Sequence, residues 1–324
     1  MDIYSVQTNA ATGKMKVGIL CGRQPGKFGW LAGNIYNYLS TNKDEKNFQI
    51  IHLFGDFLNQ KIWAEIKEKN FDCLINAVGY RGKNSIQDCE KGVGQEKSRQ
   101  SNLMVVQKAV DFCRSRNIKL IQISTACVFD GYQKNNLIQG LTEKVETYKI
   151  ISLTKEFTEG DVACRDKFGE YVGTMYGRHK WQAEEYIRRN YYWNSVILRP
   201  HLPFNSDKNI ANIIHRMNNF KAVYDEKQSM TYVPDLCKFI DMCLADLDYF
   251  SGQVFNVVNA PPISMADIDA YRTVYLAEAD KLEVVADLKN KAIILDNKKI
   301  YQHINLTEMG MAMMNTFSAY AKEK

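Results

Sequence analysis

The chain has 324 residues, of which 24% are charged, and its formal net charge is +5. This length suits one large α/β domain or two lobes, and the composition speaks against bulk disorder. Basic residues are interleaved with acidic ones, which is typical of solvated helix faces, so we expect no nucleic-acid partner. No apolar run approaches the roughly 18 residues of a membrane span, and residues 1–15 lack an apolar signal segment. We therefore expect a cytoplasmic protein without a membrane partner.

The eight cysteines are scattered along the chain. In a protein that is not exported, we expect them to be free thiols rather than disulfides. No pair has the CxxC spacing of a zinc or redox site. The sequence therefore predicts no metal site.

Apolar periodicity predicts strands that alternate with helices. The strands are expected at 16–21, 48–54, 72–77, 118–124 and 195–199, and the helices at 30–39, 61–70, 95–116 and 174–190. Such alternation implies crossover connections, and hence an α/β fold with a Rossmann-type doubly wound parallel sheet. Residues 129–173 are polar and irregular, as functional loops often are.

Glycines fill the turn between the first predicted strand and the first predicted helix. Gly22, Gly26 and Gly29 have a GxxxGxxG spacing. At this position glycines let the backbone approach a pyrophosphate, and the helix N-terminus supplies N–H donors. Arg23 and Lys27 lie inside the turn and would neutralise a 2′-phosphate, which favours NADPH over NADH, although basic residues in an exposed turn need no ligand.

The order of the predicted elements also divides the chain into three parts. We expect an N-terminal extension over 1–14, a dinucleotide-binding Rossmann domain over 15–199, and a smaller mixed α/β lobe over 200–324 that binds substrate. The boundary falls at Pro200 because the later elements are shorter and less regular. Asp56 is the acid nearest to the end of the second strand, where an acid normally holds the adenosine ribose, although it lies late for that role.

Tyr176 and Lys180 are four residues apart on a predicted helix and therefore share one face. A nearby ammonium favours the phenolate, so we expect the pKa of Tyr176 to lie below the usual value of about 10. Such a tyrosine can give a proton to a carbonyl oxygen while hydride arrives at carbon. The alternative is a surface pair on an amphipathic helix, because this spacing also occurs by chance.

Thr125 and Cys127 follow the fourth predicted strand. Ligands of open parallel sheets bind outside the carboxyl ends of the strands, so the Thr125 hydroxyl could donate to the same carbonyl oxygen. Two residues apart in extended backbone, Thr125 and Cys127 would face the same side. The alternative is that Cys127 is a small buried hydrophobic residue.

Together these segments resemble the extended short-chain dehydrogenase/reductases. More narrowly they resemble the dTDP-4-dehydrorhamnose reductases and the bifunctional nucleotide-rhamnose 3,5-epimerase/4-reductases. The resemblance covers about residues 15–300 and rests on Gly22-Arg23, Gly29-Trp30, Gly55-Asp56-Phe57, Asn76-Ala77, Cys89-Glu90, Asn102, Ser124-Thr125-x-Cys127-Val128-Phe129, Thr158-Glu159, Tyr176-Gly177-x-x-Lys180, Leu198-Arg199-Pro200 and Ser229-Met230-Thr231.

The resemblance implies an NADPH-dependent reductase of a nucleotide-linked 4-keto-6-deoxy sugar and leaves 3,5-epimerase activity open. It implies a catalytic triad of Thr125, Tyr176 and Lys180, with Cys127 as the epimerisation acid/base. Substrate contacts would come from Thr125, Cys127 and Arg216. Cofactor contacts would come from Gly22, Arg23, Gly26, Lys27, Phe28, Gly29, Asp56, Phe57, Asn76, Ala77, Asn102 and Lys180.

Three departures from the family pattern bear on these expectations. The glycine turn is one residue longer than usual. Arg216, with His215 beside it, replaces the second epimerase acid/base, and an arginine is a poor proton carrier. Asn290 replaces an arginine that would contact the sugar diphosphate. Two alternative functions therefore stay open. One is another nucleotide-sugar epimerase or dehydratase, and the other is a non-catalytic dinucleotide-binding regulatory subunit. A homodimer is also an open possibility.

Overall fold

The computed structural model describes most of the chain, in eight segments. These are residues 13–22, 29–41, 48–83, 85–129, 156–161, 173–276, 280–285 and 293–322. Five residues that the sequence analysis singled out lie outside the described residues, namely Arg23, Gly26, Lys27, Phe28 and Asn290. Their expected contacts stay predictions.

A parallel sheet of six strands forms the centre of the molecule. Its strands are β1 (Met15–Gly22), β2 (Phe48–Phe54), β3 (Cys73–Asn76), β4 (Lys119–Ile123), β5 (Ser195–Pro200) and β9 (Gln253–Val257). Their order is β2-β1-β3-β4-β5-β9, and every neighbouring pair is parallel. This confirms the expected Rossmann-type doubly wound sheet, and the five strands expected from the sequence all form.

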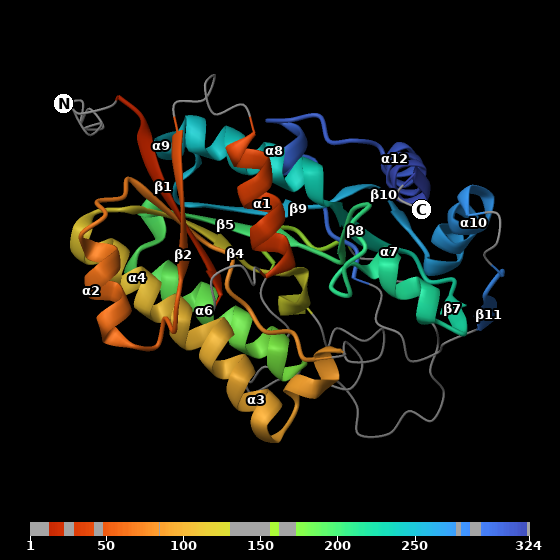
Figure 1. Cartoon of the computed structure of the whole chain (residues 1–324), viewed down its shortest axis with the longest axis horizontal. Coiled ribbons are helices and arrows are strands. Elements are labelled where there is room, and N and C mark those ends of the chain that lie inside the picture. Colours follow the sequence, from red (N-terminus) through yellow and green to blue (C-terminus); the bar gives the residue numbers. More distant parts are fainter. Residues whose placement is uncertain are drawn as a thin grey trace.

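The two faces of the sheet are both covered by helices, as Figure 1 shows. One face packs against α1 (Trp30–Ser40), α8 (Val233–Ala245) and α9 (Leu247–Phe250). The other packs against α2 (Gln60–Lys67), α4 (Val105–Arg116) and α6 (Met175–Asn190). Because both faces are buried, the strands are near-continuous apolar runs, which is why they stood out in the sequence.

The expected helix over 95–116 forms as two helices on one axis. α3 (Gly92–Arg99) runs into α4 through a π-helical turn over Gln100–Met104. A π-turn adds a residue to the helical repeat and often marks a functional position. Here it contains Asn102, one of the residues expected at the cofactor site.

The sheet has a topological switch point between β1 and β3. β1 pairs with β2 on one side and with β3 on the other, so the connections that leave these two strands turn to opposite faces. Crevices at such points are the usual ligand sites of open α/β sheets. Gly22, the last residue of β1, lies at this point.

A second, smaller lobe lies beside the carboxyl ends of the strands (Figure 1). It has a core of its own, built around Phe204, Met230, Ile268 and Phe317. The strands are β6 (Pro203–Phe204), β7 (Ala222–Tyr224), β8 (Gln228–Tyr232), β10 (Asn259–Ile263) and β11 (Glu283–Val285). The helices are α7 (Ile213–Arg216), α10 (Met265–Tyr275) and α12 (Met309–Lys322), whereas α11 (Lys298–Tyr301) packs against β9 in the core of the main sheet.

The division at residue 200 stays a prediction about domains, and the chain passes between the two cores repeatedly after this residue. After β8, the chain returns to the main sheet as α8 and β9, and it then goes back to the small lobe through β10. Residues 233–257 therefore belong to the core of the main sheet. None of the helices within the described segments is long and apolar enough to cross a membrane.

A buried ion pair joins helix α6 to the carboxyl ends of β4 and β5. The Arg199 guanidinium donates to both carboxylate oxygens of Glu184, at 3.0 and 2.6 Å. The Ser124 hydroxyl donates to the same carboxylate at 2.5 Å. Burial raises the pKa of Glu184, but Arg199 and Ser124 more than offset this effect and bring the pKa below its usual 4.5.

We predict that Glu184→Gln lowers the free energy of unfolding by about 3–5 kcal/mol, because it leaves the buried Arg199 without a counter-ion. Since the folded-state pKa of Glu184 is depressed, its contribution is complete above pH 4.5 and disappears as the pH falls through the folded pKa. Urea unfolding at several pH values measures both effects.

The matched control is Glu185→Gln on the same helix. Within the described residues Glu185 forms an ion pair with the exposed Arg189, so its loss should change the free energy of unfolding by less than about 1 kcal/mol. Equal effects of the two substitutions would contradict the role of the buried pair.

Candidate functional site

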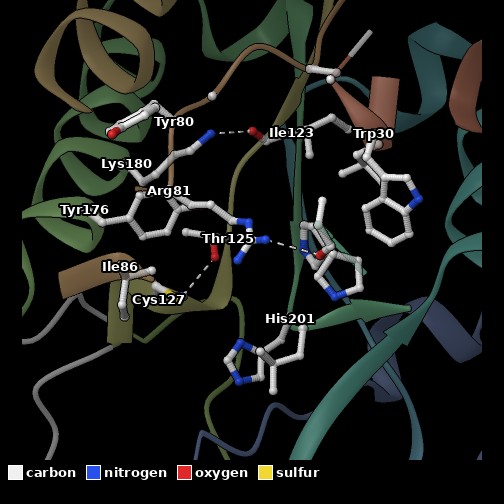
Figure 2. Close-up of a pocket in the computed structure, with 18 of the residues that line it drawn as sticks. Trp30, Tyr80, Arg81, Ile86, Ile123, Thr125, Cys127, Tyr176, Lys180 and His201 are labelled. Carbon is white, nitrogen blue, oxygen red and sulfur yellow. Dashed lines mark hydrogen bonds between the residues drawn. The ribbon is translucent and has the colours of Figure 1, made fainter. Parts of the chain in front are cut away.

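A cavity of about 370 Å³ opens at the carboxyl ends of the central strands. It collects the four residues that the sequence analysis predicted to be catalytic, and we call it the Tyr176 cavity. Thr125, Cys127, Tyr176 and Lys180 line it, and so does Arg216 from the small lobe. Figure 2 shows Thr125 and Cys127, which follow β4, converging with Tyr176 and Lys180 of α6. The expected grouping is therefore present, although the role of each residue stays a prediction.

The first turn of α6 sets the positions of Tyr176 and Lys180. Thr174 caps this helix, since its hydroxyl accepts from the Gly177 N–H at 3.2 Å. Lys180 lies one turn after Tyr176, and its Nζ donates to the Ile123 carbonyl at 3.1 Å. Gly79 lies beside Lys180, and a Cβ at this position would come tightly, at 3.1 Å, against the Asn102 side-chain oxygen. The ammonium is thus anchored at the end of β4.

Thr125 and Cys127 reach the cavity in a different way from the expected one. The backbone is not extended, because Ala126–Phe129 form a 3₁₀ turn directly after Thr125. The Cys127 N–H donates to the Thr125 hydroxyl oxygen at 3.2 Å. Both side chains still line the cavity, so the prediction of a shared face holds while its geometric reason is wrong.

The expected lowering of the Tyr176 pKa is also wrong for this structure. Burial raises the pKa above its usual 10, and the neighbouring Cys127 adds to this, whereas a hydrogen bond with Thr125 acts in the opposite direction. Burial also lowers the pKa of Lys180 from 10.5 to about 8, against the attraction of Glu184. The structure therefore holds Tyr176 as a neutral phenol at pH 7, with its proton available for donation.

A second cavity, of about 430 Å³, continues from the first along the switch point, and we call it the Gly22 groove. Gly22, Gly29, Asp56, Phe57 and Ala77 line it, as the sequence analysis expected. The two cavities share five lining residues, namely Gly29, Ala77, Val78, Gly79 and Tyr80. An elongated ligand could therefore span both cavities.

The features of the Gly22 groove fit a dinucleotide. Helix α1 points its N-terminus at the groove, and none of the described side chains caps it, so its N–H groups could bind a phosphate. Gly22 has a φ of 145°, which an L-residue rarely adopts. The Asp56 side chain accepts from the Leu58 N–H at 3.2 Å and shapes the turn at the far end of the groove.

Asn76 and Asn102 are both fully buried and line neither cavity. Asn76 accepts from the Val78 N–H at 3.1 Å, and Asn102 accepts from the Tyr80 N–H at 3.0 Å and donates to the Tyr80 carbonyl at 2.7 Å. These amides hold residues 77–80, which form the wall between the two cavities. The structure thus gives them a supporting position rather than the expected direct contact with cofactor.

The two candidates for the second epimerase acid/base lie in different surroundings. Arg216 lines the Tyr176 cavity, and burial, together with the nearby Arg81, lowers the pKa of its guanidinium. His215 is not part of the cavity lining, because its Nδ1 lies 2.8 Å from the Tyr320 hydroxyl on α12. The structure therefore places Arg216, and not the neighbouring His215, at the Tyr176 cavity.

Several residues of the Tyr176 cavity were not predicted, namely Trp30, Tyr80, Arg81 and His201. Trp30 donates from Nε1 to Asp207 at 2.8 Å and so ties the start of α1 to the small lobe. His201 is buried, which lowers its pKa from 6.5 to about 4. Arg81 and His201 follow the carboxyl ends of β3 and β5, where open parallel sheets bind ligands. Their position shortly after a predicted strand could therefore have identified them in the sequence as candidate site residues.

This fold and site define a Rossmann-type α/β protein with a groove at the switch point of its sheet and an adjoining cavity that collects Thr125, Tyr176 and Lys180. No family model matches the chain. Its sequence is 25% identical over 253 residues to the bifunctional dTDP-4-dehydrorhamnose 3,5-epimerase/reductase of Arabidopsis thaliana, covering 76% of this chain and 73% of that protein. A trifunctional UDP-rhamnose-forming enzyme of the same plant is 24% identical, but the match covers only 33% of its length.

Solved structures agree with this similarity. The L780 UDP-rhamnose synthase of Acanthamoeba polyphaga mimivirus superposes with a TM-score of 0.74 at 17% identity, covering 95% of this chain and 100% of that one. A dTDP-4-dehydrorhamnose reductase of Bacillus anthracis, solved with NADP, superposes with a TM-score of 0.70 at 16% identity, covering 96% and 99%. A dTDP-glucose 4,6-dehydratase of the same organism, solved with NAD, superposes with a TM-score of 0.68 at 14% identity, covering 95% and 97%. The resemblance predicted from the sequence is confirmed.

The seven described cysteines are all free thiols, and Cys127 differs from the other six because it is partly exposed at the cavity. Burial raises the pKa of Cys21 to about 12 and also raises the pKa of Cys73, Cys89, Cys113 and Cys243.

Since the thiolate is the nucleophile, we predict that iodoacetamide alkylates Cys127 at least about tenfold faster than these five buried cysteines. Quantitative peptide mass spectrometry measures the rates, and faster labelling of Cys113 would contradict the geometry.

Proposed function

We propose that this protein is an NADPH-dependent reductase of a nucleotide-linked 4-keto-6-deoxy sugar. The observation that carries the proposal is the convergence of Thr125, Tyr176 and Lys180 in a cavity that is continuous with a dinucleotide groove. The similarity to nucleotide-rhamnose epimerase/reductases supports the substrate class. The cofactor would lie in the Gly22 groove with its reactive end in the Tyr176 cavity.

A reduced nicotinamide bound at this site would supply hydride to the carbonyl carbon. The Thr125 hydroxyl orients the carbonyl oxygen, and Tyr176 gives that oxygen a proton. Because burial raises the pKa of Tyr176, the phenol keeps this proton until negative charge develops on the substrate oxygen. Lys180, held by the Ile123 carbonyl, faces the wall that the two cavities share. In this position the Lys180 ammonium could contact the nicotinamide ribose of a bound cofactor.

The preference for NADPH rests on Arg23 and Lys27 in the glycine turn. These residues lie outside the described part of the chain, so the support is the sequence and the NADP complex of one structural relative. A charge-assisted contact to a 2′-phosphate is worth about 1.5–3 kcal/mol, or roughly ten- to a hundredfold in affinity. NADH would then be the weaker cofactor. We further propose that the enzyme works in the cytoplasm, and a homodimer stays open.

Epimerisation at C3 and C5 is a second activity that one observation favours. Cys127 lies in the same cavity as Tyr176, and the carbons that flank a C4 ketone carry acidic protons. A thiolate there could remove such a proton. Arg216 cannot readily exchange protons, but its guanidinium could stabilise the resulting enolate. Two other functions compete with this proposal. One is another nucleotide-sugar epimerase or dehydratase, and the other is a non-catalytic dinucleotide-binding subunit. A turnover assay distinguishes between them.

We predict that Tyr176→Phe lowers ketone reduction by roughly 10²–10⁴-fold, because the substitution removes the general acid without removing the ring. The measurement is NADPH oxidation with dTDP- and UDP-linked 4-keto-6-deoxy sugars, repeated with NADH. NADPH affinity should change little. Near-normal turnover of the Tyr176→Phe variant would show that Tyr176 is not the general acid. A wild-type protein that binds NADPH but reduces none of these ketones would favour the function of a regulatory subunit.

We predict that the wild type exchanges the C3 and C5 protons of the same ketones in D₂O and that Cys127→Ser loses this exchange while reduction persists. The reason is that the hydroxyl of serine is far less acidic than a thiol. NMR of the sugar follows the exchange, and reduction by the same variant is the internal control. Wild type without exchange would identify a reductase without epimerase activity.

A further inference from the structure

Arg81 enters the Tyr176 cavity from the segment that follows β3. Figure 2 shows its side chain reaching into the cavity beside Thr125 and Tyr176. Its Nη2 donates across the cavity to the carbonyls of Ala211 and Ile210, at 3.3 and 3.4 Å. The described part of the chain gives Arg81 no carboxylate partner and no acceptor for its Nε and Nη1 atoms. Two nitrogens of a charged guanidinium are therefore available to a ligand.

The lining of this cavity has an unbalanced charge. Arg81, Lys180 and Arg216 all contribute to it, and the described lining residues include no aspartate or glutamate. The two arginines act on one another, since Arg81 contributes to the lowered pKa of Arg216. A partly buried guanidinium such as that of Arg81, with no carboxylate partner among the described residues, is costly unless negative charge enters its site. The cavity is thus prepared for a species that carries or develops negative charge.

The ammonium of Lys180 is held by the backbone, since its Nζ donates to the Ile123 carbonyl at 3.1 Å. Arg81 reaches into the cavity beside Tyr176. Burial and the thiols of Cys127 and Cys89 raise the pKa of Tyr176, whereas the Thr125 hydrogen bond and Arg81 lower it. Arg81 is therefore a cation that favours the phenolate of Tyr176.

We propose that Arg81 is a further catalytic residue, whose guanidinium contacts the reacting oxygens and stabilises the negative charge that passes from the sugar to Tyr176. This inference rests on the proposed function. Hydride adds to the ketone carbon, and the π electrons of the C=O bond move to oxygen. That oxygen takes the proton of Tyr176, which becomes a phenolate facing Arg81. A proton from solvent then restores the phenol, so ketone, hydride and proton yield the alcohol.

The first test needs no substrate. 3,5-Difluorotyrosine is incorporated at position 176, because its fluorines lower the phenol pKa into a measurable range and report it by fluorine NMR. Arg81→Gln should raise the apparent pKa by about one unit or more, which is tenfold in the ionisation constant. Arg81→Lys should move it less. Lys83→Gln, which removes an exposed charge two residues further on, is the matched control and should not move it.

The second test is steady-state reduction of the nucleotide-linked ketone by NADPH. Arg81→Gln should lower kcat by at least roughly tenfold, as expected when a donor to a developing oxyanion is lost, and Arg81→Lys should recover part of the rate. A higher KM with an unchanged kcat would mean that Arg81 only binds substrate, and it would overturn the proposal. So would a fluorine titration in which Arg81→Gln matches Lys83→Gln.

The two tests separate this inference from the function on which it rests. If the wild type reduces no nucleotide-linked ketone, the proposed function fails, while the fluorine titration still decides whether Arg81 controls Tyr176. If the wild type reduces the ketone and Arg81→Gln behaves like Lys83→Gln in both assays, the function stands and the role of Arg81 is wrong.

Discussion

The buried contact of Glu184 with Arg199 and Ser124 is the constraint on which the candidate site depends. It joins the middle of α6 to the carboxyl ends of β4 and β5 by three hydrogen bonds. Tyr176 and Lys180 lie on α6, and Thr125 follows Ser124, so this contact fixes the helix that carries the acid relative to the strand that carries the hydroxyl. Burying such a pair is costly, and its hydrogen bonds make the arrangement specific rather than merely stable.

The main sheet and the helical positions of Tyr176 and Lys180 could be predicted from the sequence for a simple physical reason. Strands buried on both faces must be apolar throughout, so 16–21 and 118–124 stand out from their polar surroundings. A spacing of four residues on a capped helix fixes which side chains share a face, independently of the rest of the fold. Local patterns of this kind survive folding because the backbone geometry that they need is itself local.

Properties that depend on distant segments could not be predicted in the same way. Asn76 and Asn102 match residues expected at a cofactor site, yet long-range packing turns their amides toward the backbone of Val78 and Tyr80. The return of α8 and β9 to the main sheet follows from pairing between β5 and β9, which no local pattern encodes. The contacts of Arg81 with residues 210 and 211 join segments about 130 positions apart, so only the fold brings them together.

Burial also changes the chemistry that spacing alone suggests. Bringing a phenol and an ammonium together favours the ionised pair in water, but in this cavity burial raises the pKa of Tyr176 and lowers that of Lys180 to about 8. Both shifts oppose charge. A phenol that stays protonated is the form that a reductase needs, because its task is to donate a proton rather than to remove one. After the proton has been transferred, the buried phenolate of Tyr176 is high in free energy and must be stabilised by a cation that already faces it. A site of this kind therefore depends on preorganised positive charge around the tyrosine rather than on a tyrosine that is ionised at rest.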